Sequence, residues 1–353
     1  MKYIAFHLPQ YHTFPENDEF WGKGFTEWVN VKKALPLYKN HNQPRIPLDN
    51  NYYSMVELST LEKQAEISRN YGVYGFCYYH YWFNGKLLMQ KPLELLLANP
   101  QVDQKFCFSW ANEPWTRSWD GKTGDVIVEQ EYGDSSDWEK HFLYLLPFFK
   151  DERYIKIDGR PVFLIYRTES IPCLDSMIDC WNKLSEQNGL KPIYFVETLT
   201  YFQSRPVSHK TQAVVDFEPM YVLQYGRSIF SKVMDRIFSE AKDFFRSTKI
   251  RFYTYDSVWK KIINCKIDSC GKKLYRGAFV DWDNTPRRSQ KGTVFEGATE
   301  KKFGKFLKSL GVAAENDFIF INAWNEWAEG AYLEPDEKNE FRYLMEVKKL
   351  TLL

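Results

Sequence analysis

Eight short apolar runs are spaced along the chain, and polar or turn-forming residues bound each of them. The runs cover residues 3–6, 73–79, 106–110, 162–166, 193–196, 213–217, 277–280 and 318–323. Most are continuously apolar and lack the alternation of a half-exposed strand, a pattern typical of strands buried on both faces of a parallel sheet. The pattern therefore predicts eight buried strands.

Helix-like stretches separate these runs. The spacing of apolar positions predicts helices over residues 55–71, 138–149, 174–188 and 299–310, with Asp134 or Ser136 as a cap for the second and Gly189 and Gly311 as ends of the third and fourth. Eight strands that alternate with helices are typical of a (β/α)₈ TIM barrel. The alternative is a doubly wound sheet, but no GxGxxG or GxxxxGKS/T sequence follows any of the strands.

Two connections are much longer than usual. Residues 223–273 carry amphipathic patches at 229–245 and 255–263, which predicts a helical insertion, and residues 8–51 are rich in Pro, Asn, His and aromatics. Both follow strands, so both should lie on the face where barrel enzymes keep their active sites. We therefore expect a single barrel domain over residues 1–353 with long βα-loop insertions.

Charge and composition narrow the possible partners and compartment. The chain has 47 Lys and Arg against 46 Asp and Glu, so neither nucleic acid nor an anionic membrane surface is expected as the main partner. No apolar stretch approaches the roughly 18 residues of a transmembrane segment, and the apolar N-terminus is too short for a signal peptide. Six cysteines without a CxxC pair do not form a disulfide scaffold. We expect a reduced, cytoplasmic protein.

The predicted strands end in an unusual mixture of aromatic and polar residues. Aromatic residues make up 18% of the chain, and rings that stack on the C–H faces of a sugar, with polar groups for its hydroxyls, suit an oligosaccharide or polysaccharide substrate. The candidate substrate-binding residues at these ends are His7, Tyr11, Tyr79, His80, Trp82, Trp110, Asn112, Glu113, Trp119, Tyr166, Glu218, Asp281, Trp282, Asn325 and Trp327.

Several of these residues have a second interpretation. The run 78–82 could pack at the rim of the barrel core. His7, His12 and His80 lack the spacing of a metal site, and we expect neither a metal nor another cofactor. Asp281 and Asp283 resemble the DxD metal-nucleotide clamp of many glycosyltransferases, although this short pattern arises easily by chance.

The segment after the eighth strand carries the strongest catalytic signal. Glu326 and Glu329 are three residues apart, beside Trp324 and Trp327, and positions i and i+3 of a helical turn share a face. Two close carboxylates with an apolar rim would hold their protons with different affinities, so that one serves as an acid and the other as a base. Glycoside cleavage needs such a pair. The alternative is that one glutamate is catalytic and the other forms a cap or a salt bridge.

The same segment resembles a known signature. Residues 324–335, WNEWAEGAYLEP, are similar to the signature of glycoside hydrolase family 99, in which an NEWxEG segment carries both catalytic glutamates. The rest of the chain is more similar to WbsX, a family 99-like group from bacterial O-antigen and capsule loci. The matching stretches are residues 6–11, 16–29 (ENDEFWGKGFTEWV), 78–86, 110–121 (WANEPWTRSWDG), 129–133 (EQEYG), 154–166 and 282–288 (WDNTPRR). The resemblance covers nearly the whole chain.

The resemblance implies a (β/α)₈ barrel and the chemistry of a retaining endo-α-mannosidase, in which the 2-hydroxyl of the sugar is the internal nucleophile and a 1,2-anhydro sugar forms. Glu326 would take the 2-hydroxyl proton, and Glu329 would protonate the leaving oxygen and later activate water. The matching stretch 16–29 adds Glu27 and Trp28 to the residues expected to bind substrate. Pro114 and Ser118 depart from the family pattern ANENWTRRW, so contacts made at these positions should differ.

Three other functions stay open on the sequence. WbsX proteins are commonly described as glycosyltransferases, which implies a nucleotide-sugar or lipid-linked donor. Within the hydrolases, Asn112-Glu113-Pro114 resembles the NEP acid/base motif of other barrel glycosidases, so Glu113 could pair with Glu326. A non-catalytic glycan-binding protein would need the aromatic residues but not the paired glutamates.

Overall fold

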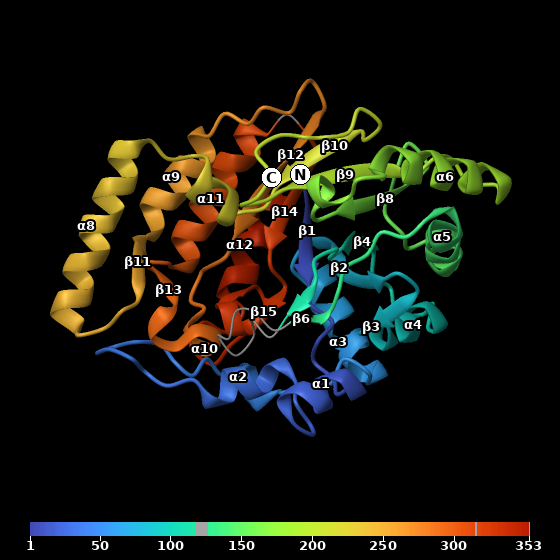
Figure 1. Cartoon of the computed structure of the whole chain (residues 1–353). Helices are drawn as coiled ribbons and strands as arrows, with labels where there is room; N and C mark the ends of the chain where they lie inside the picture. Colours follow the sequence, from blue (N-terminus) through green and yellow to red (C-terminus); the bar gives the residue numbers. More distant parts are fainter. Residues whose placement is uncertain (117–125, 315, 353) are drawn as a thin grey trace.

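The computed structural model describes residues 1–116, 126–314 and 316–352. Eight parallel strands form a closed barrel in the order β1-β2-β4-β8-β9-β10-β12-β14, and β14 pairs with β1 to complete it (Figure 1). Their bounds are Lys2–His7, Val73–Phe83, Phe106–Trp110, Arg160–Ile165, Tyr194–Leu199, Ala213–Asp216, Lys273–Phe279 and Phe318–Asn322. The prediction of a TIM barrel is confirmed, and the doubly wound alternative is wrong.

The apolar runs become strands because they are buried on both faces. All five residues of β4 and of β14 are buried, as expected for strands between a filled barrel interior and a layer of helices. Gly277 on β12 is required by the close approach of β10, since a Cβ atom there would lie 1.9 Å from the Asp216 carbonyl oxygen.

Several strands are longer than the apolar runs predicted; β2, for example, continues past residue 79 to Phe83. In β12 and β9 the added residues include buried polar side chains that contact partners on other segments. The prediction began the seventh strand at Gly277, but β12 begins at Lys273 and includes Arg276, which contacts Asp216 on β10 at 3.4 Å. The prediction ended the fifth strand at Val196, but β9 continues through the buried Glu197 to Leu199.

Helices cover the outside of the barrel between successive strands. They are α3 (Leu58–Asn70), α4 (Lys91–Ala98), α5 (Ser135–Lys150), α6 (Leu174–Gln187), α11 (Glu300–Ala313) and α12 (Arg342–Thr351). Asp134 caps α5 by accepting a hydrogen bond from the Ser136 amide at 2.9 Å. The prediction that Gly311 ends its helix is wrong, because α11 continues to Ala313.

Both long connections contain helices on the same side of the barrel. Residues 8–51 form α1 (Pro15–Trp21), α2 (Glu27–Lys33) and the short η1 (Leu48–Asn50). The connection from β10 to β12 forms α7 (Met220–Gln224), α8 (Ile229–Arg246), β11 (Arg251–Thr254) and α9 (Tyr255–Asn264), and β11 pairs in parallel with β13 (Thr293–Glu296). In Figure 1, α8 lies at the left edge of the molecule, farther out than the barrel helices. None of the helices in the described ranges combines the length and apolarity that spanning a bilayer requires.

Candidate active site

The chain makes a tight turn after β14, and both predicted catalytic glutamates lie on it. Glu326 ends β15 (Asn325–Glu326), which pairs antiparallel with β16 (Ala331–Tyr332), and Glu329 ends the short helix η5 (Trp327–Glu329). Gly330 closes the turn with a left-handed φ of +64°, and a Cβ atom there would lie 2.9 Å from the Asp283 amide nitrogen. Glycine is therefore the residue that fits this position.

One arginine connects the two glutamates to a third. Arg287, on the short helix α10 (Thr285–Arg288) that follows β12, places Nη2 3.1 Å from Glu326 Oε2 and Nη1 2.6 Å from Glu329 Oε1. Its Nε and Nη2 donate to the two oxygens of Glu27, at the start of α2, each at 3.2 Å. A fixed guanidinium fork suits such multiple carboxylate contacts.

The cluster holds three carboxylates around one guanidinium. The free energy needed to ionise each carboxyl group therefore depends on its own burial and contacts. Glu27 is fully buried and Glu326 is 7% exposed, whereas the Glu329 side chain is 24% exposed. Burial raises the pKa of Glu326 from 4.5 to about 8; Arg287 opposes this rise, while Glu329 and Glu27 add to it. Glu326 therefore binds a proton more readily than an ordinary glutamate does.

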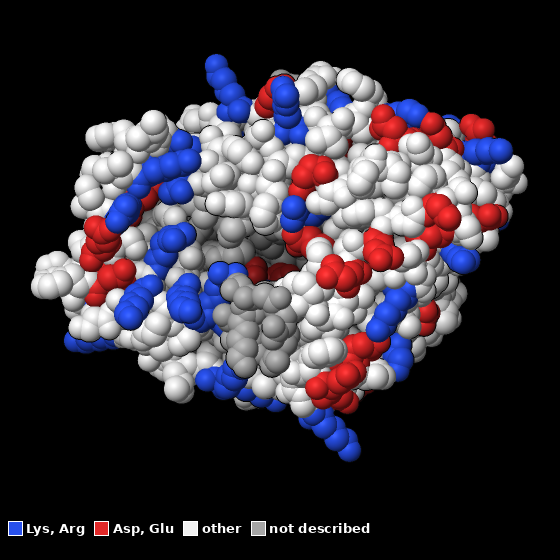
Figure 2. Space-filling view, viewed as in Figure 1, with Lys and Arg blue, Asp and Glu red and all other residues white. Residues whose placement is uncertain are grey.

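Two hollows meet at this cluster. The first, which we name the Glu113 hollow, has a volume of about 570 Å³ and is lined by Tyr81, Glu113, Trp115, Phe202, Arg287, Arg288 and Glu329, among others. The second, the Arg251 hollow, has about 390 Å³ and is lined by residues that include Tyr166, Tyr201, Phe217, Arg227, Arg251, Tyr253, Trp282, Arg288 and Glu329. Arg288 and Glu329 line both, so the hollows are neighbours. Figure 2 shows a hollowed face with acidic atoms on its floor and Lys and Arg side chains along its left rim.

Several residues predicted to bind substrate instead support the turn from behind. The Asn325 side chain accepts a hydrogen bond from the Leu8 amide at 2.8 Å and donates to the Leu8 carbonyl at 3.0 Å, which ties the turn to the end of β1. The Tyr11 hydroxyl donates to the Asn325 carbonyl and accepts from the Trp327 amide. Trp28 and Trp327 are buried against each other, with ring centroids 5.5 Å apart. These contacts fix where the two glutamates point.

Glu334, which sequence reasoning did not select, is the central acceptor of this support. It accepts hydrogen bonds from the Tyr53 hydroxyl, Gln64 Nε2 and Trp327 Nε1 at 2.7–2.8 Å. Burial raises its pKa to about 7, although the three hydrogen bonds oppose the rise. It therefore stabilises the turn without reaching either hollow.

Replacing Glu334 with Ala should destabilise the protein by about 3 kcal/mol or more, because three buried donors would lose their acceptor. The measurement is the free energy of unfolding in denaturant at pH 8. The matched control is Glu337→Ala, which removes an exposed glutamate that accepts a hydrogen bond from the Asp49 amide and should change the free energy by less than about 0.5 kcal/mol. Equal effects of the two substitutions would contradict this assignment.

Five other residues were predicted to bind substrate; the structure brings three of them to the hollows and a fourth near the carboxylates. Glu113 contacts Arg167 at 2.5 Å and faces the Glu113 hollow with a side chain that is 40% exposed. Tyr166 and Trp282 line the Arg251 hollow. Burial, followed by the charge of Glu326, raises the pKa of Tyr79 well above its ordinary value, so Tyr79 lies near the carboxylates. The fifth of this group, Trp119, lies outside the described residues.

Four predicted binding residues point away from the barrel mouth, into the layer between strands and helices. His7 bonds Gln64 at 3.0 Å, His80 bonds His141 at 2.8 Å, and Trp82 stacks on His141 at 4.5 Å. Trp110 donates to the Trp82 carbonyl. Burial lowers the pKa of both His7 and His80 to about 3, so these imidazoles are neutral and serve packing. Asn112 is also buried; it donates to the Arg167 carbonyl and accepts from the Arg167 amide.

The strand-end acids outside the cluster are engaged by protein donors. Glu218 is buried, accepts from the Val222 amide at 3.1 Å and lies beside Asp216. Asp281 accepts from Arg45 at 2.9 Å, and Asp283 accepts from His41, Gln43 and Thr285. The DxD pair is therefore held by protein donors. Among residues 1–116, 126–314 and 316–352, no group of three or more His, Cys, Asp or Glu is arranged to hold a metal ion.

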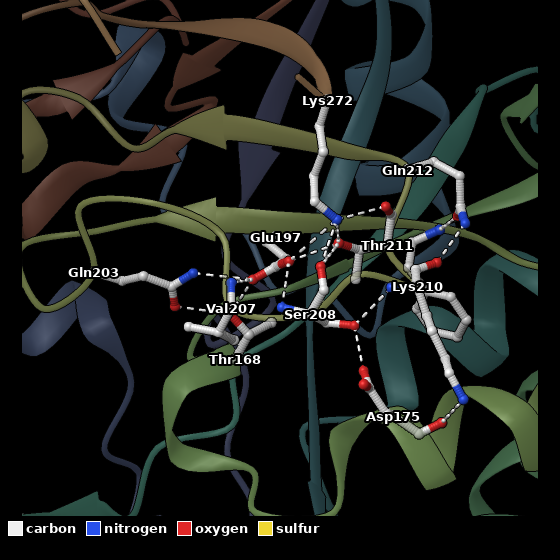
Figure 3. Close-up of polar contacts among 11 residues, drawn as sticks. Thr168, Asp175, Glu197, Gln203, Val207, Ser208, Lys210, Thr211, Gln212 and Lys272 are labelled. Atoms are coloured by element: carbon white, nitrogen blue, oxygen red, sulfur yellow. Dashed lines mark hydrogen bonds and ion pairs between the residues drawn. The ribbon is translucent and has the colours of Figure 1, made fainter. Parts of the chain in front are cut away.

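Glu197 is a buried acid outside the cluster, and both of its carboxylate oxygens accept several hydrogen bonds from the protein. Its carboxylate accepts from Thr168 Oγ1, Gln203 Nε2 and the Val207 amide on one oxygen and from Thr211 Oγ1 and the Ser208 amide on the other, and Lys272 Nζ lies 3.8 Å away (Figure 3). This network anchors the loop 200–212, which connects β9 to β10 and carries Tyr201 and Phe202 to the hollows. Glu197 therefore has a structural role.

The predicted catalytic and substrate-binding residues did not include Arg287, Arg288, Arg227, Arg251 or Tyr81. Arg287 lies in the matching stretch 282–288, but an isolated arginine carries no sign that three carboxylates surround it. Tyr81 could have been found from alternation, because it lies on the same side of β2 as Tyr79. Arg227 and Arg251 lie in the predicted insertion, where nothing in the sequence indicated which side chains face the site.

Comparisons with known proteins give a family and a fold. A model of the family described as Glycosyltransferase WbsX matches residues 3–347. Two curated relatives from strains B100 and ATCC 33913 of Xanthomonas campestris pv. campestris, both named Uncharacterized protein WxcX, are 32% identical over 356 residues, which are 97% of this chain and 48% of theirs. The chain thus spans about half the length of the curated relatives it matches.

Two solved structures share the fold. A glycoside hydrolase-like protein superimposes with a TM-score of 0.60 at 13% identity, over 99% of this chain and 93% of the other. The GH99 endo-α-mannosidase from Bacteroides thetaiotaomicron gives a TM-score of 0.56 at 13% identity, over 99% and 96%. At this identity the similarity establishes the architecture alone.

Proposed function

The chain belongs to the WbsX glycosyltransferase family, and we propose that it is a glycan-active enzyme whose Glu326 and Glu329 are the acid–base pair of a retaining endo-glycosidase. The observation that carries this proposal is the cluster in which Arg287 contacts both glutamates and Glu27. The cluster supplies two carboxylates, one of them with a raised pKa, and a fixed positive charge at the place where the two hollows meet.

The position of Glu329 supports cleavage inside a glycan chain. Because Glu329 lines both hollows, sugar units on the two sides of the cleaved bond each have a cavity of suitable size. Aromatic side chains are present in both, with Trp115 and Phe202 in one and Tyr166, Phe217 and Trp282 in the other. These rings can stack on sugar faces.

The proposed reaction uses the pair as the family resemblance implies. Glu326 takes the proton of the 2-hydroxyl while that oxygen attacks the anomeric carbon, and Glu329 donates its proton to the departing glycosidic oxygen. The resulting 1,2-anhydro sugar is opened by water, with Glu329 as base and Glu326 returning a proton to the 2-oxygen. In the proposed productive form the pair holds one proton, and Glu329 carries it. A carboxylate whose pKa is near 8 is also a stronger base toward a hydroxyl than one near 4.5.

The pH dependence should report this shared proton. We expect kcat/KM to fall as the pH rises through about 8, because the cluster then loses the proton that the leaving oxygen needs. The measurement is the initial rate at low substrate concentration between pH 5 and 10. A Glu334→Gln variant is the control, since Glu334 is the other buried glutamate of this turn with a raised pKa, and the decline near 8 should survive in it. A rate that increases up to pH 10 would contradict the proposal.

The direct test is digestion of a panel of α-mannans and bacterial surface polysaccharides, with chelator and without nucleotide sugar. Released oligosaccharides are identified by mass spectrometry. Release by the wild-type protein and not by Glu326→Gln is the expected result. If Glu326→Gln binds a glycan with unchanged affinity and still releases the same products, the cluster is not catalytic.

The family description favours a second candidate, transfer of a glycosyl group to another glycan. This activity would use the same cluster and hollows. Repeating the panel with nucleotide sugars and a divalent metal separates the two, because a transferase lengthens the acceptor and a glycosidase shortens it.

A further inference from the structure

The Arg251 hollow carries an excess of positive charge. Arg227, Arg251 and Arg288 all line it, and within the described residues Glu329 is the sole carboxylate of its lining. That carboxylate already contacts Arg287 at 2.6 Å. The lining therefore offers guanidinium groups without an equal number of protein anions.

The arginines differ in how they are held. Arg227 is fixed, because its Nε donates to the Leu223 carbonyl at 2.7 Å, its Nη1 contacts Asp235 at 3.0 Å, and its guanidinium lies 5.3 Å from the Tyr253 ring centroid. Arg251 and Arg288 have no carboxylate partner in the described part of the chain. Two arginines are thus available to a ligand, beside a third whose geometry is set in advance.

This excess is local and does not belong to the whole surface. The chain has a net charge of only +1, and three basic residues of neighbouring α8 have acidic partners: Arg236 contacts Glu240, and Lys242 and Arg246 contact Glu296. Figure 2 shows Lys and Arg side chains gathered along the left rim of the hollow. Arg251 and Arg288, which line the cavity next to Glu329, have no such acidic partner within the described residues.

The insertion between β10 and β12 builds this wall. Arg227 precedes α8, and Arg251 and Tyr253 lie on β11, which pairs with β13. Arg288 comes from α10. The segments that bring these arginines together are separate in the chain, so the charge is a product of the fold.

We propose that the Arg251 hollow binds an anionic group of the glycan, either the carboxylate of a uronic acid or a phosphate. This inference rests on the proposed function and names its substrate class. Guanidinium groups bind carboxylates and phosphates through paired, charge-assisted hydrogen bonds, whereas a neutral sugar would leave the arginines in this cavity without compensation. Tyr166, Phe217 and Trp282 supply the faces on which the ring of the charged sugar stacks.

The test measures binding by calorimetry at low salt with three probes. They are an oligosaccharide that carries one glucuronic acid in each repeat, the same oligosaccharide with its carboxyl groups reduced to hydroxymethyl groups, and inorganic pyrophosphate. The proteins are the wild type, Arg251→Gln, Arg288→Gln and the control Arg236→Gln, which removes a charge from an exposed side chain outside this hollow.

The wild type should bind at least one anionic probe about tenfold or more tightly than the reduced oligosaccharide. Arg251→Gln and Arg288→Gln should each lose about tenfold in that affinity, and Arg236→Gln should not. Tighter binding of the glucuronide assigns the hollow to a carboxylate, and tighter binding of pyrophosphate assigns it to a phosphate. Equal affinity for acidic and reduced probes, or binding of neither anion, would overturn the inference.

Failure of this inference is distinguishable from failure of the proposed function. Glu329→Gln keeps all three arginines and should still bind the anionic probe. Turnover of glycans without any preference for an anionic sugar would disprove only the anionic subsite. Anion binding by a protein that cleaves no glycan would disprove only the proposed glycosidase activity.

Discussion

Glu329→Gln should lower the turnover of a polysaccharide substrate by about 10³-fold or more, because the departing oxygen would lose its proton donor. Glutamine keeps the size of the side chain and can still accept from Arg287, so the fold should be unchanged. The measurement is kcat for the wild type and the variant on the substrate found in the polysaccharide panel, with unfolding curves to confirm equal stability.

A substrate with a leaving group that needs no proton makes this test sharper. On a glycosyl fluoride, Glu329→Gln should form the anhydro sugar at nearly the wild-type rate, whereas Glu326→Gln should remain inactive because the 2-hydroxyl has no base. The reverse pattern would exchange the two roles. Glu113→Gln is the matched control in the Glu113 hollow; if it, and not Glu329→Gln, abolished turnover, the acid would be Glu113 and the NEP interpretation would apply.

Arg287→Gln should have the largest effect on stability. The substitution leaves Glu27, Glu326 and Glu329 close together without their shared cation, and breaking a buried ion pair on one side typically costs about 3–5 kcal/mol. Arg287→Lys should restore only part of this, since one ammonium cannot reproduce contacts made by Nε, Nη1 and Nη2. The measurement is the free energy of unfolding of each variant.

The loss in Arg287→Gln should also depend on pH. It should be larger at pH 9 than at pH 5, because protonation at low pH removes part of the repulsion among the three carboxylates. The control is Arg288→Gln, which changes the neighbouring arginine of α10 and breaks no ion pair within the described residues. An Arg287→Gln protein as stable as Arg288→Gln at pH 9 would show that the cluster does not need its cation.

The eight strands could be predicted because burial on both faces leaves a direct record in the sequence. The limits of β9 and β12 could not, because Glu197 and Arg276 are buried only through partners that arrive from other segments. Polar residues inside a strand look like a strand end until those partners are known. The local pattern therefore predicted the strands and the fold, but it did not predict the residues at which β9 and β12 begin and end.

The candidate site was predicted in part for a related reason. Position at a strand end correctly directed attention to the barrel mouth, but alternate residues of a strand face opposite sides. Thus Tyr79 lies near the carboxylates, while His80 and Trp82 pack against α5. Sequence reasoning selected all three. The link through Arg287 could not be predicted, since its glutamates follow different strands.

The sequence separation of the cluster residues also determines how early during synthesis the site can form. Glu27 and Arg287 are 260 residues apart, and Arg287 and Glu326 a further 39. At about 5–20 residues per second, a ribosome needs roughly 15–60 s to pass from the first glutamate to the last. During that interval Glu27 remains hydrated and α2 has no final docking position. The contacts between Arg287 and its three glutamates can therefore form only after the last strand has been synthesised and the barrel closes.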